Sequence, residues 1–378
     1  MKYIFWTLYL ISCTITGFSQ QTLQRSIVHD GLVREYILYV PASYAPGVPA
    51  PLLLNFHGYT SNALEQMFYG DFRPIADTTG VIVVHPQGTV DLLGNTHWNV
   101  GWGTSTVDDV GFTSALIDSL SAAYTIDPTR IYSTGMSNGG FFSYKLACDL
   151  SDRIAAIASV TGSMNVNQAA SCHPEHQMPV MEIHGTADQT VAYTGNILFA
   201  PIPSVLSFWV GYNGCTTPAI VNPIADTDTA DGCTAEHHFY PAGQNGATVE
   251  HYKITGGAHT WPGSAFGGVG TNQDIDACKE IWRFFSKYDI HGLIETTSTS
   301  AETDRHEVLV FPNPSADYIT IRMQDQKDMP FMISNLMGQP IFKGHLSASN
   351  PRIDIRALAT GIYILSADGI AIMFAKSE

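Results

Sequence analysis

Short, continuously apolar runs alternate with stretches of helical spacing along most of the chain. The apolar runs lie at residues 51–58, 80–88, 130–135, 155–162, 179–185 and 250–257. They lack the alternation of half-exposed strands, which favours strands covered on both faces. Residues 109–124, 138–150 and 276–288 carry apolar residues at helical spacing. The alternation predicts an α/β fold, in which helices flank a mostly parallel sheet and ligands bind at the carboxyl ends of its strands.

The pattern changes at both ends of this region. Two β-prone runs flank Asp30 and Gly31, which predicts a β-hairpin at the start. Residues 291–306 are rich in Thr, Ser and Glu and poor in bulky apolar residues, which predicts a flexible linker. Residues 307–378 form short alternating runs separated by turn residues, typical of a small all-β sandwich. We therefore predict a main domain at 21–290 and a second domain at 307–378.

The first 20 residues have the pattern of a secretory signal peptide. Lys2 precedes an apolar run over residues 3–15, and small or polar residues follow it. An alternative interpretation is a lipoprotein signal acylated at Cys13, which would make the signal very short. No later apolar stretch reaches about 20 residues, so we expect no membrane span. This segment predicts export.

The net charge narrows the possible partners, and the cysteine content bears on disulfides and metal sites. The 34 acidic and 18 basic residues give a formal net charge of −16, which repels nucleic acid and anionic lipid. Five cysteines follow the signal peptide, and an odd number leaves at least one thiol unpaired. The spacing C-x-x-C is absent, so we expect no metal site. These five are Cys148, Cys172, Cys215, Cys233 and Cys278.

Residues 130–142, RIYSTGMSNGGFF, carry the strongest chemical signal in the chain. Gly135, Ser137 and Gly139 form the G-x-S-x-G pattern between a β-prone run and a helical one, the setting of a nucleophile on a strained turn. Glycine is needed at both flanking positions because larger side chains would crowd that turn. An ordinary helix cap is the alternative role for Ser137.

A serine nucleophile requires a histidine to take its proton and a carboxylate to orient the histidine. In this kind of fold they follow the serine in the order acid, then histidine, on loops after later strands. Asp188 and His259 fit that order, each just past a predicted strand. Asp226 or Asp228 remains an alternative acid. His251 and the pair at 237 and 238 lie in strand-like runs, so we expect structural roles for them.

Other residues near these loops have several possible roles. The amides of Tyr59 and Asn138 are the expected oxyanion donors, because Asn138 begins a helix and Tyr59 follows an earlier strand. Adjacent Asp108 and Asp109 are expected to cap the helix that follows them. His57 and His184 are expected to pack near the nucleophile. The remaining candidates, as substrate-lining residues, are Trp98, Trp102 and Trp261, and closing the core is the alternative role for Trp261.

The residues also resemble known families. Residues 27–290 resemble the secreted polyhydroxybutyrate depolymerase and feruloyl or acetylxylan esterase group of α/β-hydrolases, through the motifs FHGYTSN, WNVGW, DDVGF, RIYSTGMSNGG, HGTADQTVAY and GGAHTWPG. This resemblance implies a triad of Ser137, Asp188 and His259 and a Cys148–Cys172 disulfide. A bond between Cys215 and Cys233 is a weaker expectation, since Cys233 departs from the family pattern.

Residues 308–378 resemble the C-terminal sorting domain of type IX secretion in Bacteroidetes, through VFPNPSADYITI, ISNLMGQPIFKG and LATGIYIL. The resemblance implies an extracellular protein, released or attached to the cell surface. We predict a secreted serine esterase without cofactor, acting on polyester or on esters of plant polysaccharide. The competing prediction is a non-catalytic surface-binding protein on a hydrolase scaffold.

Overall fold

In the computed structural model the chain divides into two compact units, residues 1–295 and 296–378. The structure describes residues 20–294, 309–311, 315–322, 329–335, 339–346, 352–367 and 370–377. The predicted signal peptide at 1–20 lies outside these residues except at its last position. Of the predicted linker at 291–306, residues 295–306 also lie outside the described residues. Its first residues form a short hairpin, in which β14 (Gly292–Leu293) pairs with β13 (Tyr288–Asp289).

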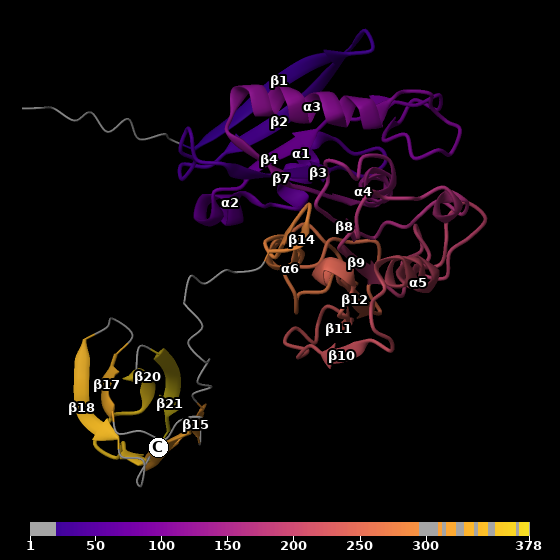
Figure 1. Ribbon diagram of the computed structural model, residues 1–378. Helices are drawn as coiled ribbons and strands as arrows, with labels where there is room; N and C mark the ends of the chain where they lie inside the picture. Colours follow the sequence, from indigo (N-terminus) through magenta and orange to yellow (C-terminus); the bar gives the residue numbers. More distant parts are fainter. Residues whose placement is uncertain are drawn as a thin grey trace, which may run out of the picture. The chain divides into compact units, whose positions relative to one another are not determined.

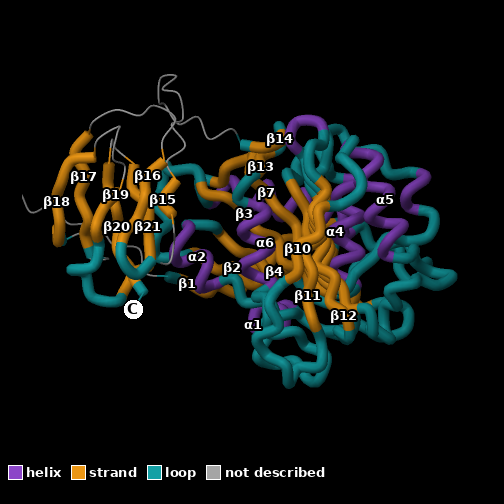
Figure 2. The backbone as a smooth tube through the Cα atoms, turned by 90° about the horizontal axis from the view of Figure 1, so that it is seen from below, coloured by secondary structure: helices purple, strands orange, loops and turns teal. Residues whose placement is uncertain are grey.

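A ten-stranded sheet forms the centre of the first unit (Figure 2). Its central strands β4, β3, β7, β8, β9 and β12 are parallel, and antiparallel pairs, β1 with β2 and β11 with β10, flank them. In sheet order the strands are β1 (Gln21–His29), β2 (Leu32–Val40), β4 (Ile82–Pro86), β3 (Ala50–Phe56), β7 (Ile126–Met136), β8 (Ala156–Val160), β9 (Val180–Gly185), β12 (Val249–Thr255), β11 (Thr234–Tyr240) and β10 (Ile220–Pro223). The hairpin predicted at Asp30 and Gly31 joins β1 to β2, with left-handed φ angles of 48° and 75°.

Helices cover both faces of this sheet (Figure 1). Leu52 and Leu54 of β3 face a core cluster that includes residues of α3, α4 and α5, whereas Leu53 faces a second cluster with residues of α2 and α6. This double burial explains why the parallel strands are continuously apolar, and it confirms the predicted α/β class. None of the described helices is long and apolar enough to cross a membrane. The helices are α1 (Ala63–Tyr69), α2 (Arg73–Thr79), α3 (Asp109–Ala123), α4 (Asn138–Asp149), α5 (Ile202–Asn213) and α6 (Ala277–Phe285).

The second unit consists of two small antiparallel sheets. Apolar side chains from both sheets, among them Ile319, Ile353, Ile333 and Leu365, form one buried cluster. The period of two in the sequence produces this core, because alternate residues of each strand face the opposite sheet. The sheets are β15 (Leu309–Phe311), β16 (Tyr318–Arg322) and β19 (Arg352–Asp354), and β18 (Pro340–Leu346), β17 (Met329–Ser334), β20 (Gly361–Ala367) and β21 (Ile370–Lys376).

The structure confirms one predicted disulfide and contradicts another. Cys148 and Cys172 form a disulfide, as the family resemblance implied. Cys215 and Cys233 are free thiols, so the expectation of a bond between them is wrong. Cys215 packs against the α5 side of the sheet, whereas Cys233 belongs to the core cluster on the α6 side. The sheet separates the two thiols.

The start of α3 corrects the expectation that both neighbouring aspartates cap it. Asp108 is the N-cap and accepts a hydrogen bond from the Gly111 amide. Asp109 is buried inside the first turn and pairs with the buried Arg34 at 2.6 Å. It also accepts a hydrogen bond from the Asn99 amide at 2.7 Å. Asp109 therefore joins α3 to β2 and to the loop before the helix.

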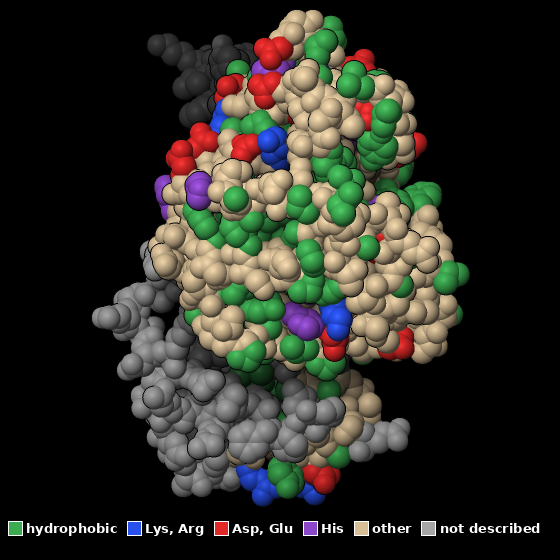
Figure 3. Space-filling model, turned by 90° about the vertical axis from the view of Figure 1, so that its right-hand side faces the viewer, with side chains coloured by type: hydrophobic (Ala, Val, Ile, Leu, Met, Phe, Trp, Pro, Cys, Tyr) green, Lys and Arg blue, Asp and Glu red, His purple; other side chains and the backbone are tan. Residues whose placement is uncertain are grey.

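Charged side chains are sparse over the face of the molecule drawn in Figure 3. Glu250 of β12, in contrast, is a buried charged residue. Its carboxylate contacts His237, Arg283 and Lys287. Burial alone would raise the pKa of Glu250, but the hydrogen bond from His237 and the guanidinium of Arg283 lower it to about 2. This carboxylate therefore ties α6 and the chain after it to the antiparallel edge of the sheet.

We expect Glu250→Gln to lower the free energy of unfolding at pH 7 by about 3 kcal/mol, from a pKa difference of about 2.5 units. Because the pKa of Glu250 is lower in the folded chain, its contribution is complete above about pH 4.5 and disappears as pH falls toward 2. Denaturant unfolding between pH 7 and pH 3 measures the difference. Glu236→Gln, at a more exposed ion pair, is the control and should change stability by less than about 1 kcal/mol. A difference for Glu250→Gln that does not vary with pH would contradict this interpretation.

Candidate active site

Ser137 occupies the sharp turn between β7 and α4. Its φ and ψ are 54° and −118°, a strained conformation for a residue with a side chain. A Cβ added to Gly139 would lie 2.2 Å from the Phe56 carbonyl oxygen, and one added to Gly135 would lie 2.6 Å from it. Both glycines are therefore required by close backbone approach, as the G-x-S-x-G pattern predicted.

The acid and the histidine meet at the carboxyl ends of β9 and β12. Oδ2 of Asp188 lies 2.7 Å from Nδ1 of His259. Oδ1 of the same carboxylate accepts hydrogen bonds from the amides of Thr190 and Val191, both at 2.8 Å. The Asp188 side chain is fully buried, and that of His259 is 20% exposed. Asp188 is thus held from three directions, with one oxygen directed at the imidazole.

The alternative acids, Asp226 and Asp228, do not contact this histidine among the described residues. Asp228 accepts a hydrogen bond from the Ala230 amide in the loop after β10. Of the three candidate acids, Asp188 is the one that the structure brings to His259.

Ser137 and His259 line the same pocket. Within the part of the chain that the structure describes, the Ser137 hydroxyl has no hydrogen-bond partner. Catalytic hydrogen bonds are often long in ligand-free sites and shorten when substrate binds. Because Nδ1 of His259 is engaged by Asp188, Nε2 is the ring nitrogen that can accept a proton from the serine.

The candidate oxyanion donors are backbone amides on two segments beside Ser137, the loop after β3 and the start of α4. A Cβ added to Gly58, the residue before Tyr59, would lie 3.5 Å from the Ser137 Cβ. Asn138 is the first residue of α4, where amides lack helical acceptors. Neither amide donates a hydrogen bond within the described residues. Two amides are thus available beside Ser137.

Trp98 connects these two segments and does not line the pocket. Its indole N–H donates to the His57 carbonyl at 3.0 Å, and its backbone N–H donates to the Asn138 side chain at 2.6 Å. The ring of His57 accepts a hydrogen bond from the Gly88 amide, and burial lowers its pKa to about 4. His57 is therefore a neutral packing residue, as expected.

The three tryptophans predicted to line the substrate site are not among the residues that line this pocket. Trp98 and Trp261 are buried, and Trp102 packs edge-to-face on Phe141. Trp261 lies against Gly70, where an added Cβ would come within 2.8 Å of its ring. Large aromatic rings next to catalytic loops are often core residues, and sequence proximity alone does not separate the two cases.

The pocket that Ser137 and His259 line has a volume of about 750 Å³ and is mostly apolar. One wall comes from α1, which the sequence prediction missed although Asn62 and Glu65 have the spacing of a helix start, with the Asn62 side chain capping the Glu65 amide. Another wall is Phe266, in a loop without any periodic signal. The lining residues are Gly58, Tyr59, Ser61, Leu64, Glu65, Gln66, Phe68, Tyr69, Met136, Ser137, His259 and Phe266.

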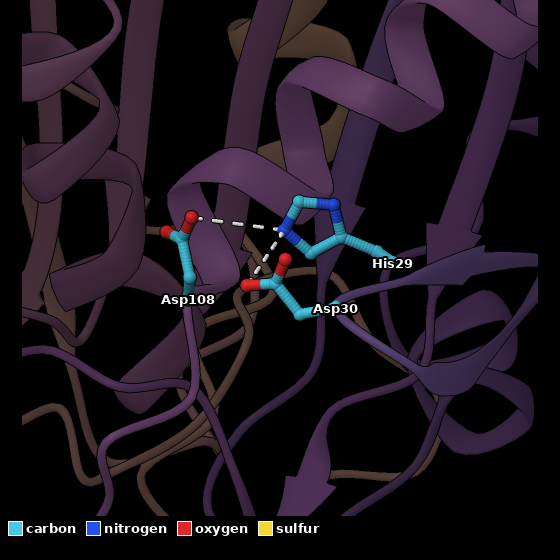
Figure 4. Close-up of side chains that lie close together, drawn as sticks. All are labelled: His29, Asp30 and Asp108. Carbon is cyan, nitrogen blue, oxygen red and sulfur yellow. Dashed lines mark ion pairs between the residues drawn. The ribbon is translucent and has the colours of Figure 1, made fainter.

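One group of residues has ligand types suited to a metal ion (Figure 4). Nε2 of His29 lies 3.7 Å from Asp30 and 3.6 Å from Asp108. Asp30 and Asp108 are both exposed, and Asp108 already caps α3. The group joins the β1–β2 hairpin to α3 and does not line the pocket of Ser137.

Each of the two units is similar to known proteins. The acetyl xylan esterase from Aspergillus awamori superposes with a TM-score of 0.52 at 15% identity, covering 71% of this chain and 99% of that protein. This likeness shows that the first unit has the α/β-hydrolase fold. The family of secretion system C-terminal sorting domains matches residues 309–371. The second unit is therefore a sorting domain, which confirms the resemblance seen in its sequence.

Curated relatives then place the chain more closely. It is 26% identical over 268 residues to a bifunctional acetylxylan esterase/xylanase of Neocallimastix patriciarum, a match that covers 71% of this chain and 35% of the relative. It is 29% identical over 238 residues to feruloyl esterase B of Piromyces equi, covering 60% and 42%. The chain spans less than half the length of either relative. The chain is therefore similar in sequence to feruloyl and acetylxylan esterases over 60% to 71% of its length.

Proposed function

We propose that this protein is a serine carboxylic-ester hydrolase with Ser137 as nucleophile, His259 as general base and Asp188 as the orienting acid. The observation that carries the proposal is the strained turn at Ser137, which lines the same pocket as His259. Nδ1 of His259 lies 2.7 Å from the Asp188 carboxylate, which leaves Nε2 free to act as the base. A surface-binding scaffold without catalytic function has no need of this arrangement.

The proposed reaction proceeds through an acyl-enzyme. Ser137 Oγ attacks the ester carbonyl carbon while Nε2 of His259 accepts its proton, and the amides of Tyr59 and Asn138 stabilise the negative oxygen. The C–O bond of the ester then breaks, and the alcohol leaves with the proton from His259. Water attacks the acyl-serine by the same route and releases the carboxylic acid. Because the imidazole must start unprotonated, activity should fall as the pH is lowered.

The lining of the pocket favours an ester with a bulky aromatic acyl group, such as a feruloyl ester. Aromatic rings from Tyr59, Phe68, Tyr69 and Phe266 surround the space beside the nucleophile. Aromatic pairs contribute attraction beyond the area they bury. An acetyl group would fill little of about 750 Å³. The similarity to feruloyl esterase B supports the same acyl group.

We expect the purified protein to release ferulate from methyl ferulate with a higher kcat/KM than acetate from 4-nitrophenyl acetate or hydroxybutyrate from its polyester. Phe68→Ala should raise the KM for methyl ferulate about two- to tenfold, because it removes one ring from the pocket. Phe208→Ala, on α5 and outside the pocket, is the matched control. Preferential hydrolysis of the acetyl ester or the polyester would contradict the proposed acyl group.

The proposed site of action is outside the cell. The sorting domain supports export through its secretion system, followed by release or attachment at the cell surface. The Cys148–Cys172 disulfide supports the same conclusion, because such bonds persist in oxidising compartments. The proposed partners are therefore the ester substrate and the secretion machinery.

A further inference from the structure

His184 lies at the end of β9, directly behind the acid Asp188, and its ring nitrogens face oxygen acceptors. Nδ1 is 2.9 Å from a carboxylate oxygen of Glu182. Nε2 is 2.8 Å from the Val191 carbonyl oxygen and 3.5 Å from Oδ2 of Asp188. All three ionisable side chains are fully buried. Among the described residues, the ring therefore has a carboxylate near each nitrogen and no hydrogen-bond donor facing either nitrogen.

His251, on the neighbouring strand β12, shows what a structural histidine looks like in the same core. Its Nδ1 donates to the Glu182 carbonyl oxygen at 2.9 Å, and its Nε2 lies 3.0 Å from the Tyr193 hydroxyl. One acceptor and one donor suit a neutral imidazole. Burial lowers the pKa of His251 to about 3. The two histidines are equally buried but have opposite surroundings.

We propose that His184 is a permanently protonated positioning residue, whose imidazolium donates one proton to Glu182 and directs the other toward Val191 and Asp188, and so fixes the charge and orientation of the catalytic acid. This inference rests on the proposed triad. His184 does not touch the substrate. It acts through Asp188, which in turn holds His259.

The surrounding groups favour the charged ring. Burial opposes the charged form of both partners and raises the pKa of Glu182, although the hydrogen bonds from His184 and Tyr144 act against that rise. The hydrogen bond and the negative charge of Glu182 in turn raise the pKa of His184 above its ordinary value. Tyr144 of α4 donates to the other Glu182 oxygen at 2.8 Å, and burial keeps its pKa well above normal, so it remains a donor. Tyr193 and His251 are the other titratable groups nearby, and we expect both to be neutral. The result is an alternating line of carboxylate, imidazolium and carboxylate leading to His259.

The full-length protein with His184→Gln tests the inference, because glutamine keeps an N–H donor but cannot carry the charge. We expect kcat for a chromogenic ester to fall about tenfold, with KM changed less than about twofold, since the ester does not touch this residue. Loss of a positive charge also makes protonation of the catalytic imidazole easier. The midpoint of the acid limb of kcat/KM should therefore move upward by about one pH unit.

His251→Gln is the matched control, because it removes an equally buried ring that bears no charge. It should leave kcat and the acid limb unchanged even if thermal stability falls. Unchanged kcat and an unchanged acid limb in His184→Gln would overturn the inference while the wild type stays active and Ser137→Ala stays inactive. If wild type and Ser137→Ala are equally active, the proposed function itself fails.

A measurement on the wild type covers the case in which His184→Gln does not fold. In ¹⁵N NMR spectra of histidine-labelled protein, both ring nitrogens of His184 should have protonated shifts from pH 6 to pH 8, whereas His251 should show one protonated and one bare nitrogen. A bare Nδ1 on His184 would mean that the shared proton resides on Glu182. That result would overturn the inference.

Discussion

Ser137→Ala should lower kcat for a chromogenic ester by about 10⁶-fold, because the acyl-enzyme can no longer form. The loss should appear in kcat with little change in KM, since one hydroxyl contributes little to a pocket of about 750 Å³. The turn that holds the residue is set by close backbone approaches at Gly135 and Gly139, so alanine should fit without refolding it. Steady-state kinetics and a thermal melt of the same preparation measure both effects.

Ser207→Ala provides the control for this change. Ser207 lies on the exposed side of α5, and its hydroxyl bonds only to the Pro203 carbonyl of its own helix among the described residues. It should retain full activity. Loss of activity in both variants, or in neither, would contradict the role proposed for Ser137.

Asp188→Asn should lower kcat by about 10⁴-fold without unfolding the protein. The two amides that hold Oδ1 of Asp188 can hold the side-chain oxygen of asparagine in the same way. The amide nitrogen of asparagine would then face Nδ1 of His259 and could only donate to it. The ring would have to carry its proton on Nε2, and in that tautomer it cannot accept the serine proton. Kinetics at several pH values will measure the loss.

Asp226→Asn and Asp228→Asn are the controls for this second change, because either residue could have been the acid on sequence grounds. Each should keep wild-type kcat, since neither contacts His259 in the described residues. A loss of about 10⁴-fold in one of them, with Asp188→Asn active, would move the acid to that position.

Local constraints explain why the sequence predicted so much of the fold and of the candidate triad. Strands buried on both faces must be continuously apolar, and a strained serine turn must have glycine at 135 and 139 where the Phe56 carbonyl approaches. Asp188 and His259 could be proposed from the sequence because each follows the end of one of these strands. In each case the signal lies within a few residues of the feature.

The features that the sequence did not predict depend on contacts between distant segments. Asp109 does not cap α3 because Arg34, 75 positions earlier, reaches its carboxylate. Trp98 and Trp261 are next to catalytic loops but fill the core on either side of the sheet. The pocket wall at Phe266 comes from a loop, where no periodicity exists to be detected. Which of several aromatic residues line the pocket depends on how distant segments of the chain pack together.

The most direct test of the serine mechanism is to locate the covalent bond. After reaction of the full-length protein with a fluorophosphonate, mass spectrometry of its peptides should find one adduct, on Ser137, and prior addition of an ester substrate should slow its formation. Hydrolysis that continues without any adduct, or an adduct on another serine that abolishes activity, would contradict the account.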